Sequence, residues 1–104
     1  MSIQNVSATR EWIKTPYEGI DISPVGGTEQ VNTAAFRIAA GIELPPHTHP
    51  VWELVTVVSG KLRLGAATLG PGDLLHTNPG ESHDVQAFEE TVFLVTVGQD
   101  RQLG

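Results

Sequence analysis

The chain has 104 residues, of which 39% are hydrophobic and 17% charged, and its net charge is −6. A chain of this length forms one domain around one core, and a negative charge without clustered Lys or Arg argues against nucleic acid or an anionic membrane surface as a partner. The sequence has no apolar run of about 18 residues for a membrane span, no basic-then-apolar N-terminus for a signal peptide, and no cysteine for disulfides or thiolate metal sites. We therefore expect a cytoplasmic domain.

The N-terminal part, residues 1–28, is expected to be an arm or a set of covering strands of the single domain 1–104. Its larger apolar residues can either cover an open barrel or add strands to a partner's sheet. They are Trp12, Ile13, Tyr17, Ile20 and Ile22. The barrel itself is expected over about residues 30–98.

From residue 31 onward, apolar residues recur with the period of two that is typical of β-strands. Strands are predicted at residues 31–40, 51–58, 61–64 and 91–97, and no stretch shows a helical period. Turn signals separate them, at Gly26-Gly27, Pro45-Pro46, Gly70-Pro71-Gly72 and Asn78-Pro79-Gly80. Short strands with frequent turns predict an all-β sandwich or barrel. Residues 51–58 (VWELVTVV) are apolar on both faces, as in a strand buried within a barrel or a dimer.

The segment HTHPVWE carries the first functional signal. Alternation along a strand directs His47 and His49 to the same side. Glu53 shares a face with valines, where an unneutralised carboxylate is costly to bury. No Lys or Arg lies between Arg37 and Lys61, so the neutralising group comes from elsewhere in the fold. A divalent cation held jointly with the two histidines meets this need.

His83, which opens the strand after the Asn78-Pro79-Gly80 turn, is the candidate for a fourth ligand. Neutral imidazoles with one carboxylate suit zinc, iron, manganese, nickel or copper. Each residue alone also has a simpler interpretation. A His-x-His pair occurs by chance on surfaces, Glu53 could be a charge at a sheet edge, and His83 could be structural.

The combination resembles the two sequence motifs of the cupin family. The first motif is matched by Gly41, His47, His49, Glu53 and Gly60, and the second by Gly72, Asp73, Gly80 and His83. Two positions depart from the second motif: Asn78 stands where proline is usual, and Ala87 where asparagine is usual. The resemblance implies a cupin jelly-roll β-barrel (a double-stranded β-helix), with one divalent metal per chain held by His47, His49, Glu53 and His83. It also implies a homodimer.

A finer resemblance rests on Glu11-Trp12, Thr15-Pro16 and Gly19, then AGIELPPHTH and NPGESH. These segments are similar to the cupin of ChrR-type anti-sigma factors and to small dioxygenases that cleave β-diketones or acyl phenols. The helical sigma-binding domain of those anti-sigma factors has no counterpart in 104 residues. Such dioxygenases often bind their metal with three histidines, so Glu53 keeps other cupin activities open.

Three functions are compatible with these residues. The favoured one is a metal-dependent enzyme of dioxygenase type that acts on a small carbonyl or enol compound. The alternatives are a non-catalytic module that senses a small molecule or a metal, and a purely structural zinc site. His76 is a candidate catalytic acid or base, although a polar residue at a strand end or dimer edge is the preferred interpretation. Asp84 should point away from His83, and Arg37 and Arg63 should form surface ion pairs.

Overall fold

A computed structural model describes residues 2–99, which form ten β-strands and, within that range, no helix. Residue 1 and residues 100–104 of the predicted domain lie outside the described part of the chain. The strands are β1 (Ile13–Lys14), β2 (Ile20–Gly27), β3 (Val31–Ile38), β4 (Glu43–Thr48), β5 (Trp52–Ser59), β6 (Leu62–Leu64), β7 (Ala67–Leu69), β8 (Leu74–Thr77), β9 (Ser82–Ala87) and β10 (Thr91–Gly98).

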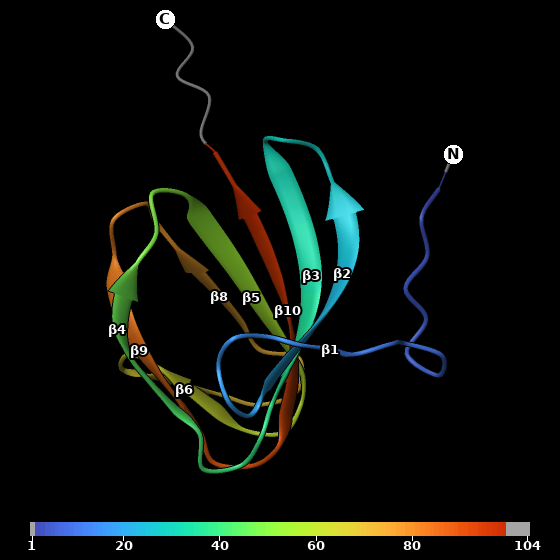
Figure 1. Ribbon diagram of the computed structural model, residues 1–104. Helices are drawn as coiled ribbons and strands as arrows, with labels where there is room; N and C mark the ends of the chain where they lie inside the picture. Colours follow the sequence, from blue (N-terminus) through green and yellow to red (C-terminus); the bar gives the residue numbers. More distant parts are fainter. Residues whose placement is uncertain (1, 100–104) are drawn as a thin grey trace, which may run out of the picture.

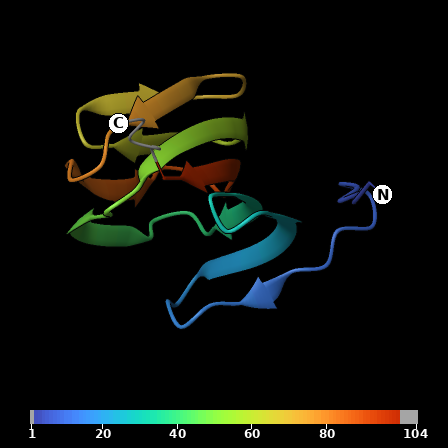
Figure 2. The same cartoon turned by 90° about the horizontal axis from the view of Figure 1, so that it is seen from above.

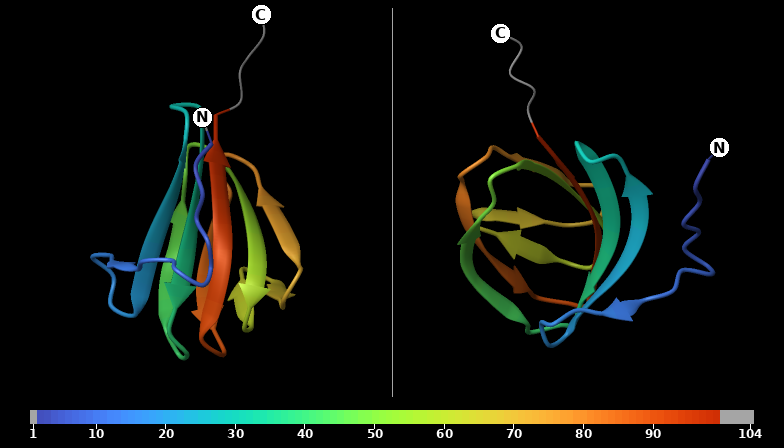
Figure 3. Two further views of the ribbon diagram at one scale, coloured as in Figure 1. Left: turned by 90° about the vertical axis from the view of Figure 1, so that its right-hand side faces the viewer. Right: turned by 45° about the horizontal axis from the view of Figure 1, so that its top comes forward.

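The strands form two antiparallel sheets that face each other. The larger sheet has the order β1-β2-β3-β10-β5-β8, and the smaller has the order β4-β9-β6-β7. Figure 1 shows the two sheets curving around a common interior, and the tilted view in Figure 3 looks into that interior. The predicted all-β, single-domain barrel is confirmed. No helix capable of crossing a membrane was found among residues 2–99.

Strand β5 illustrates how alternation builds this interior. Glu53, Val55 and Val57 are buried, whereas the intervening side chains are more exposed. Strand β10 is paired with β5 along nearly its whole length, and β8 is paired with its first half, from Glu53 to Thr56. The apolar inner face therefore packs in the barrel, and the apolar outer face of VWELVTVV, including Val58, remains on the outside of the larger sheet.

The N-terminal segment extends the chain's own sheet. Strand β1 pairs with β2, and β2 pairs with β3. Figures 1 and 2 show the preceding residues on the outer side of this sheet. There Asn5 donates a hydrogen bond to the Ser23 hydroxyl at 2.9 Å, and the Arg37 guanidinium lies 4.7 Å from the ring centre of Trp12. The sequence left open whether this segment covers the chain's own barrel or adds strands to a partner's sheet. In the structure, β1 and β2 belong to the barrel of the same chain.

The hydrophobic core is concentrated where the two sheets close on each other. Its buried members come from both sheets, and partly buried aromatic and aliphatic side chains extend it. The buried set consists of Ile20, Ile38, Val55, Val57, Leu62, Leu64, Leu69, Val85 and Ala87. Because this packing leaves one part of the interior open, the barrel contains a cavity.

Candidate metal centre

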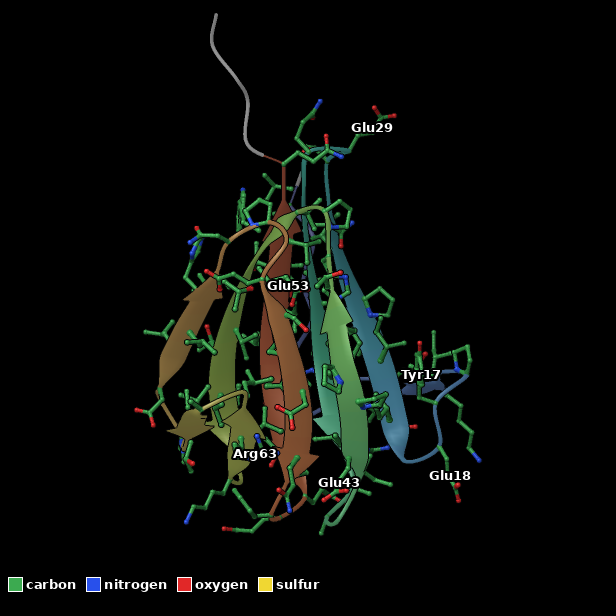
Figure 4. All side chains as sticks on the ribbon, turned by 90° about the vertical axis from the view of Figure 1, so that its left-hand side faces the viewer. Tyr17, Glu18, Glu29, Glu43, Glu53 and Arg63 are labelled. Carbon is green, nitrogen blue, oxygen red and sulfur yellow. The ribbon has the colours of Figure 1, made fainter. Side chains whose placement is uncertain are left out.

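The barrel interior contains a cavity of about 360 Å³, and the four predicted ligands all line it. They are His47, His49, Glu53 and His83. The rest of the wall is apolar. In Figure 4, Glu53 lies toward the upper end of the strands, whereas Glu43 and Arg63 lie at the lower end. The cavity therefore has one polar region within an otherwise apolar lining.

Strand pairing brings the second motif to the first. His47 on β4 is the register partner of His83 on β9. The Gly80 N–H donates a hydrogen bond of 2.9 Å to the carbonyl of His49, which ties the turn before β9 to the segment after β4. Glu53 enters from the opposite sheet. Residues that are 30 or more positions apart thus meet across the barrel.

An irregularity in β4 sets the direction of the first histidine. The register of β4 against β9 shifts between Leu44 and His47, at the Pro45-Pro46 step. Leu44 and His47 both line the cavity, although strict alternation would place residues three apart on opposite faces. A bulge is a usual location for proline in a strand, because proline lacks the N–H that the ladder needs. The diproline therefore turns His47 toward the cavity.

The candidate ligands contact one another. The ring centres of His47 and His49 are 4.9 Å apart, and those of His47 and His83 are also 4.9 Å apart. The Nε2 atom of His49 lies 2.9 Å from the Oε1 atom of Glu53. The side chain in contact with the buried carboxylate in this structure is therefore an imidazole.

The side chains are not already arranged as a preformed metal site. Within residues 2–99, no group of three or more His, Cys, Asp or Glu side chains is positioned to hold a metal ion as it stands. The Nε2 atom of His49 and the Oε1 atom of Glu53 are 2.9 Å apart, a separation that two neighbouring ligands of one metal can have. The four side chains lie close together in the wall of one cavity.

His83 has a buried ring nitrogen without a hydrogen-bond partner. This atom, Nδ1, makes no hydrogen bond to any residue in the described range 2–99. Burial lowers the pKa of His83 below its ordinary value, and the nearby His47 lowers it further. The neutral imidazole that results is the form that binds metals. Three imidazoles and one carboxylate at one end of a cavity fit a divalent transition metal.

The structure separates His76 from this group. On β8, His76 is the register partner of Leu54, and its ring stacks on Trp52 with centres 5.8 Å apart. It does not line the cavity, because the inward position of this pair of strands is taken by Glu53 and Thr77. This placement on the outer face favours the interpretation of His76 as a polar surface residue over a catalytic acid or base.

The charged residues next to the site are paired on the outside of the barrel, as predicted. Asp84 accepts two hydrogen bonds from Arg63, at 2.9 and 3.1 Å, and Arg63 lowers the pKa of the Asp84 carboxyl. Arg37 binds Asp21 at 2.7 Å. Neither arginine contributes to the cavity wall.

Two aromatic residues that the sequence analysis did not single out belong to the site. Phe36 and Phe93 both line the cavity, and their rings stack with centres 5.6 Å apart. Tyr17 was considered only as a strand residue, yet it lines a second hollow together with His47 and His49. Figure 4 shows Tyr17 beside β2. The period-two pattern placed the phenylalanines on strands but gave no sign of an open space between the sheets.

Two facing antiparallel sheets with these paired motifs define a cupin. A family model described as the ChrR cupin-like domain matches residues 3–101, so the chain belongs to the ChrR cupin-like domain family. The suspected cupin resemblance, including its ChrR-type subgroup, is confirmed. No curated protein matches the chain.

Several solved structures share the fold. KdgF from Halomonas sp. has 19% sequence identity and a TM-score of 0.80, with 98% of this chain and 96% of that chain covered. The polyketide cyclase RemF from Streptomyces resistomycificus has 17% identity and a TM-score of 0.81, with 99% and 83% covered. A chain in the structure of Rhodobacter sphaeroides SigE in complex with the anti-sigma ChrR has 20% identity and a TM-score of 0.76, with 88% and 50% covered. At these identities the similarity shows the fold alone.

Proposed function

We propose that this protein is a metal-dependent cupin enzyme that acts on a small carbonyl or enol compound. The observation that carries the proposal is the convergence of His47, His49, Glu53 and His83 at one end of an apolar cavity. These four residues would hold one divalent metal per chain, with iron, manganese, nickel, zinc and copper as candidates. A bound metal would supply Lewis acidity that stabilises an enolate and, with iron, dioxygen activation for carbon–carbon cleavage.

The chain's own residues support this role in two ways. Glu53 supplies the negative charge that the three neutral imidazoles lack, and it is 7% exposed, so its charge is weakly screened by water. The apolar wall excludes water from the space beside the histidines, which strengthens electrostatic interactions there. A small ligand can therefore bind with its polar group at the histidines and its apolar part in the barrel.

The experiment that tests the proposal is elemental analysis of protein purified without chelator. The wild type is expected to contain about one metal per chain, and Glu53→Gln, which removes the charge with little change in volume, should bind that metal at least about tenfold more weakly. Glu90→Gln is the matched control, because Glu90 is exposed in the turn between β9 and β10. This control should keep the wild-type metal content.

Two results would overturn the metal assignment. One is a wild-type protein that takes up none of the five candidate metals from solution. The other is unchanged metal affinity in both Glu53→Gln and His47→Ala. If metal binds but no carbonyl compound is consumed, the catalytic part of the proposal fails while the metal site stands.

The family assignment favours a second candidate, a non-catalytic module that senses a small molecule or a metal. One solved structure with this fold is that of SigE in complex with the anti-sigma ChrR. A sensing module would be stabilised by its ligand, by about 2.7 kcal/mol at a ligand concentration 100 times Kd, without consuming it. Product analysis of the incubated ligand separates the two candidates, since turnover identifies the enzyme.

A further inference from the structure

The part of the cavity beyond the histidines carries no charge. Between Glu53 and the far end, the wall is formed by aliphatic and aromatic side chains from both sheets. They include Phe36, Ile38, Val55, Val85, Phe93 and Val95. Glu53 is the single carboxylate in the lining, and no Lys or Arg within residues 2–99 takes part in it.

The cations of the described chain lie elsewhere. Arg37 and Arg63 are paired with Asp21 and Asp84 outside the barrel. Lys61 lies over the ring of Phe88. Arg10 and Lys14 belong to the N-terminal segment. A carboxylate or phosphate on the part of a ligand remote from the histidines would therefore find no Lys or Arg counter-ion among the described residues of the cavity wall, and burying such an unpaired charge is strongly unfavourable.

The depth of the cavity follows from the register of β5 and β10. Val97 is the partner of Glu53, and Phe93 is the partner of Val57. Four residues of strand span about 13 Å at roughly 3.3 Å per residue. Phe93 stacks on Phe36 of β3 at that depth, with ring centres 5.6 Å apart. The stack thus forms part of the cavity wall four residues along the strand from the carboxylate, and Ile20 and Ile38 line the cavity beyond it.

We propose that the cavity selects substrates whose part beyond the carbonyl is uncharged and apolar. We further propose that the Phe36–Phe93 stack narrows the path to Ile20 and Ile38 and so limits the length of that apolar part. The inference rests on the proposed function for the position of the carbonyl at the histidines. It assigns specificity to Phe36 and Phe93, which contact the remote part of the ligand. A buried apolar wall of this kind gains affinity with each methylene that enters it.

The charge part is tested with a matched pair of aryl ketones, 4-methylacetophenone and 4-acetylbenzoate. Binding is measured by calorimetry on the metal-free protein, because the carboxylate of 4-acetylbenzoate is itself a ligand for a bound metal. The neutral ketone is expected to bind at least 100-fold more tightly, because the carboxylate of its partner would be buried without a counter-ion. Equal affinity for the two compounds would overturn the proposal, as would failure of the protein to bind any neutral ketone of the series below.

The length part is tested with 4-alkylacetophenones of increasing chain length. For wild type, affinity should rise about fourfold per added CH₂ and then fall once the chain reaches the phenylalanine stack. Phe93→Ala should move that maximum to longer chains, whereas Phe88→Ala, at an exposed position 45% accessible to solvent, should leave it unchanged. If Phe93→Ala does not fold, Phe93→Leu provides the same comparison with a smaller change. An unchanged maximum in a folded Phe93 variant would refute the role of the stack.

The two proposals fail in different ways. If no metal binds, the proposed enzyme is lost, but the charge and length preferences can still be measured on the metal-free protein. If metal binds with the predicted dependence on Glu53 while 4-acetylbenzoate binds as well as the neutral ketone, the metal centre stands and the selectivity proposal is wrong.

Discussion

Glu53 shows how far a single residue can be interpreted from sequence. Its position among valines with no nearby cation in the chain indicated an unusual partner, and the structure buries it to 7% exposure. The partner present in the structure is His49, whose Nε2 atom lies 2.9 Å away. The sequence analysis named both residues as candidate metal ligands, because a buried carboxylate needs a partner that offsets its loss of hydration. Which atoms meet could not be predicted, because that depends on side-chain rotamers.

Gly98 permits a close contact that sequence patterns do not reveal. A Cβ atom at Gly98 would lie 2.3 Å from the Trp52 ring, which also stacks on His76. Gly98→Ala is therefore expected to displace the indole and reduce the free energy of unfolding by about 1–3 kcal/mol. Urea denaturation followed by tryptophan fluorescence measures this.

The control for that prediction is Gly70→Ala. Its added Cβ would have no neighbour closer than 3.9 Å, so it should leave the unfolding midpoint nearly unchanged. Equal stability of the Gly98 variant and wild type would show that Trp52 moves aside at no measurable cost.

At the scale of elements, the strands were predictable where alternation is regular. The predicted ranges 31–40, 51–58, 61–64 and 91–97 match β3, β5, β6 and β10 to within two residues at each end. The first half of β4 was not predicted as a strand, because Pro45 and Pro46 resemble a turn in sequence, and only the segment from His47 onward was interpreted as extended. The predicted common direction of His47 and His49 agrees with the structure, since both line the cavity. The bulge that sets this direction relative to Leu44 depends on pairing with β9.

The two faces of β5 should respond differently to substitution. Val57 is fully buried, whereas Val58 is 48% exposed. Val57→Ala should lower the free energy of unfolding by about 2–3 kcal/mol, through lost burial and the cavity left behind. Val58→Ala should change it by less than about 0.5 kcal/mol. Denaturant titration of both variants measures the contrast, and equal effects would mean that the strand's faces are assigned in the wrong register.

At the scale of the whole molecule, the outer face of the larger sheet bears on the sequence-based prediction of a homodimer. Leu74 and Val58 are 61% and 48% exposed, and the Trp52–His76 pair lies on the same side. We expect a dimer by light scattering, with Leu74→Lys shifting it toward monomer because a charge would be buried in an apolar contact. Phe88→Lys, in the turn between β9 and β10, is the control. A wild-type monomer at concentrations near 100 µM would contradict this prediction.

The sequence by itself determined the class of fold, the two motifs and the four candidate ligands, because period-two patterning and residue chemistry are local properties. The tertiary structure decided where these features meet. It placed His83 beside His47, put His76 outside the barrel, and joined Phe36 to Phe93 in the cavity wall. These outcomes depend on strand register and sheet closure, which arise from contacts between residues distant in the chain, and a shift of one residue would exchange the inner and outer faces.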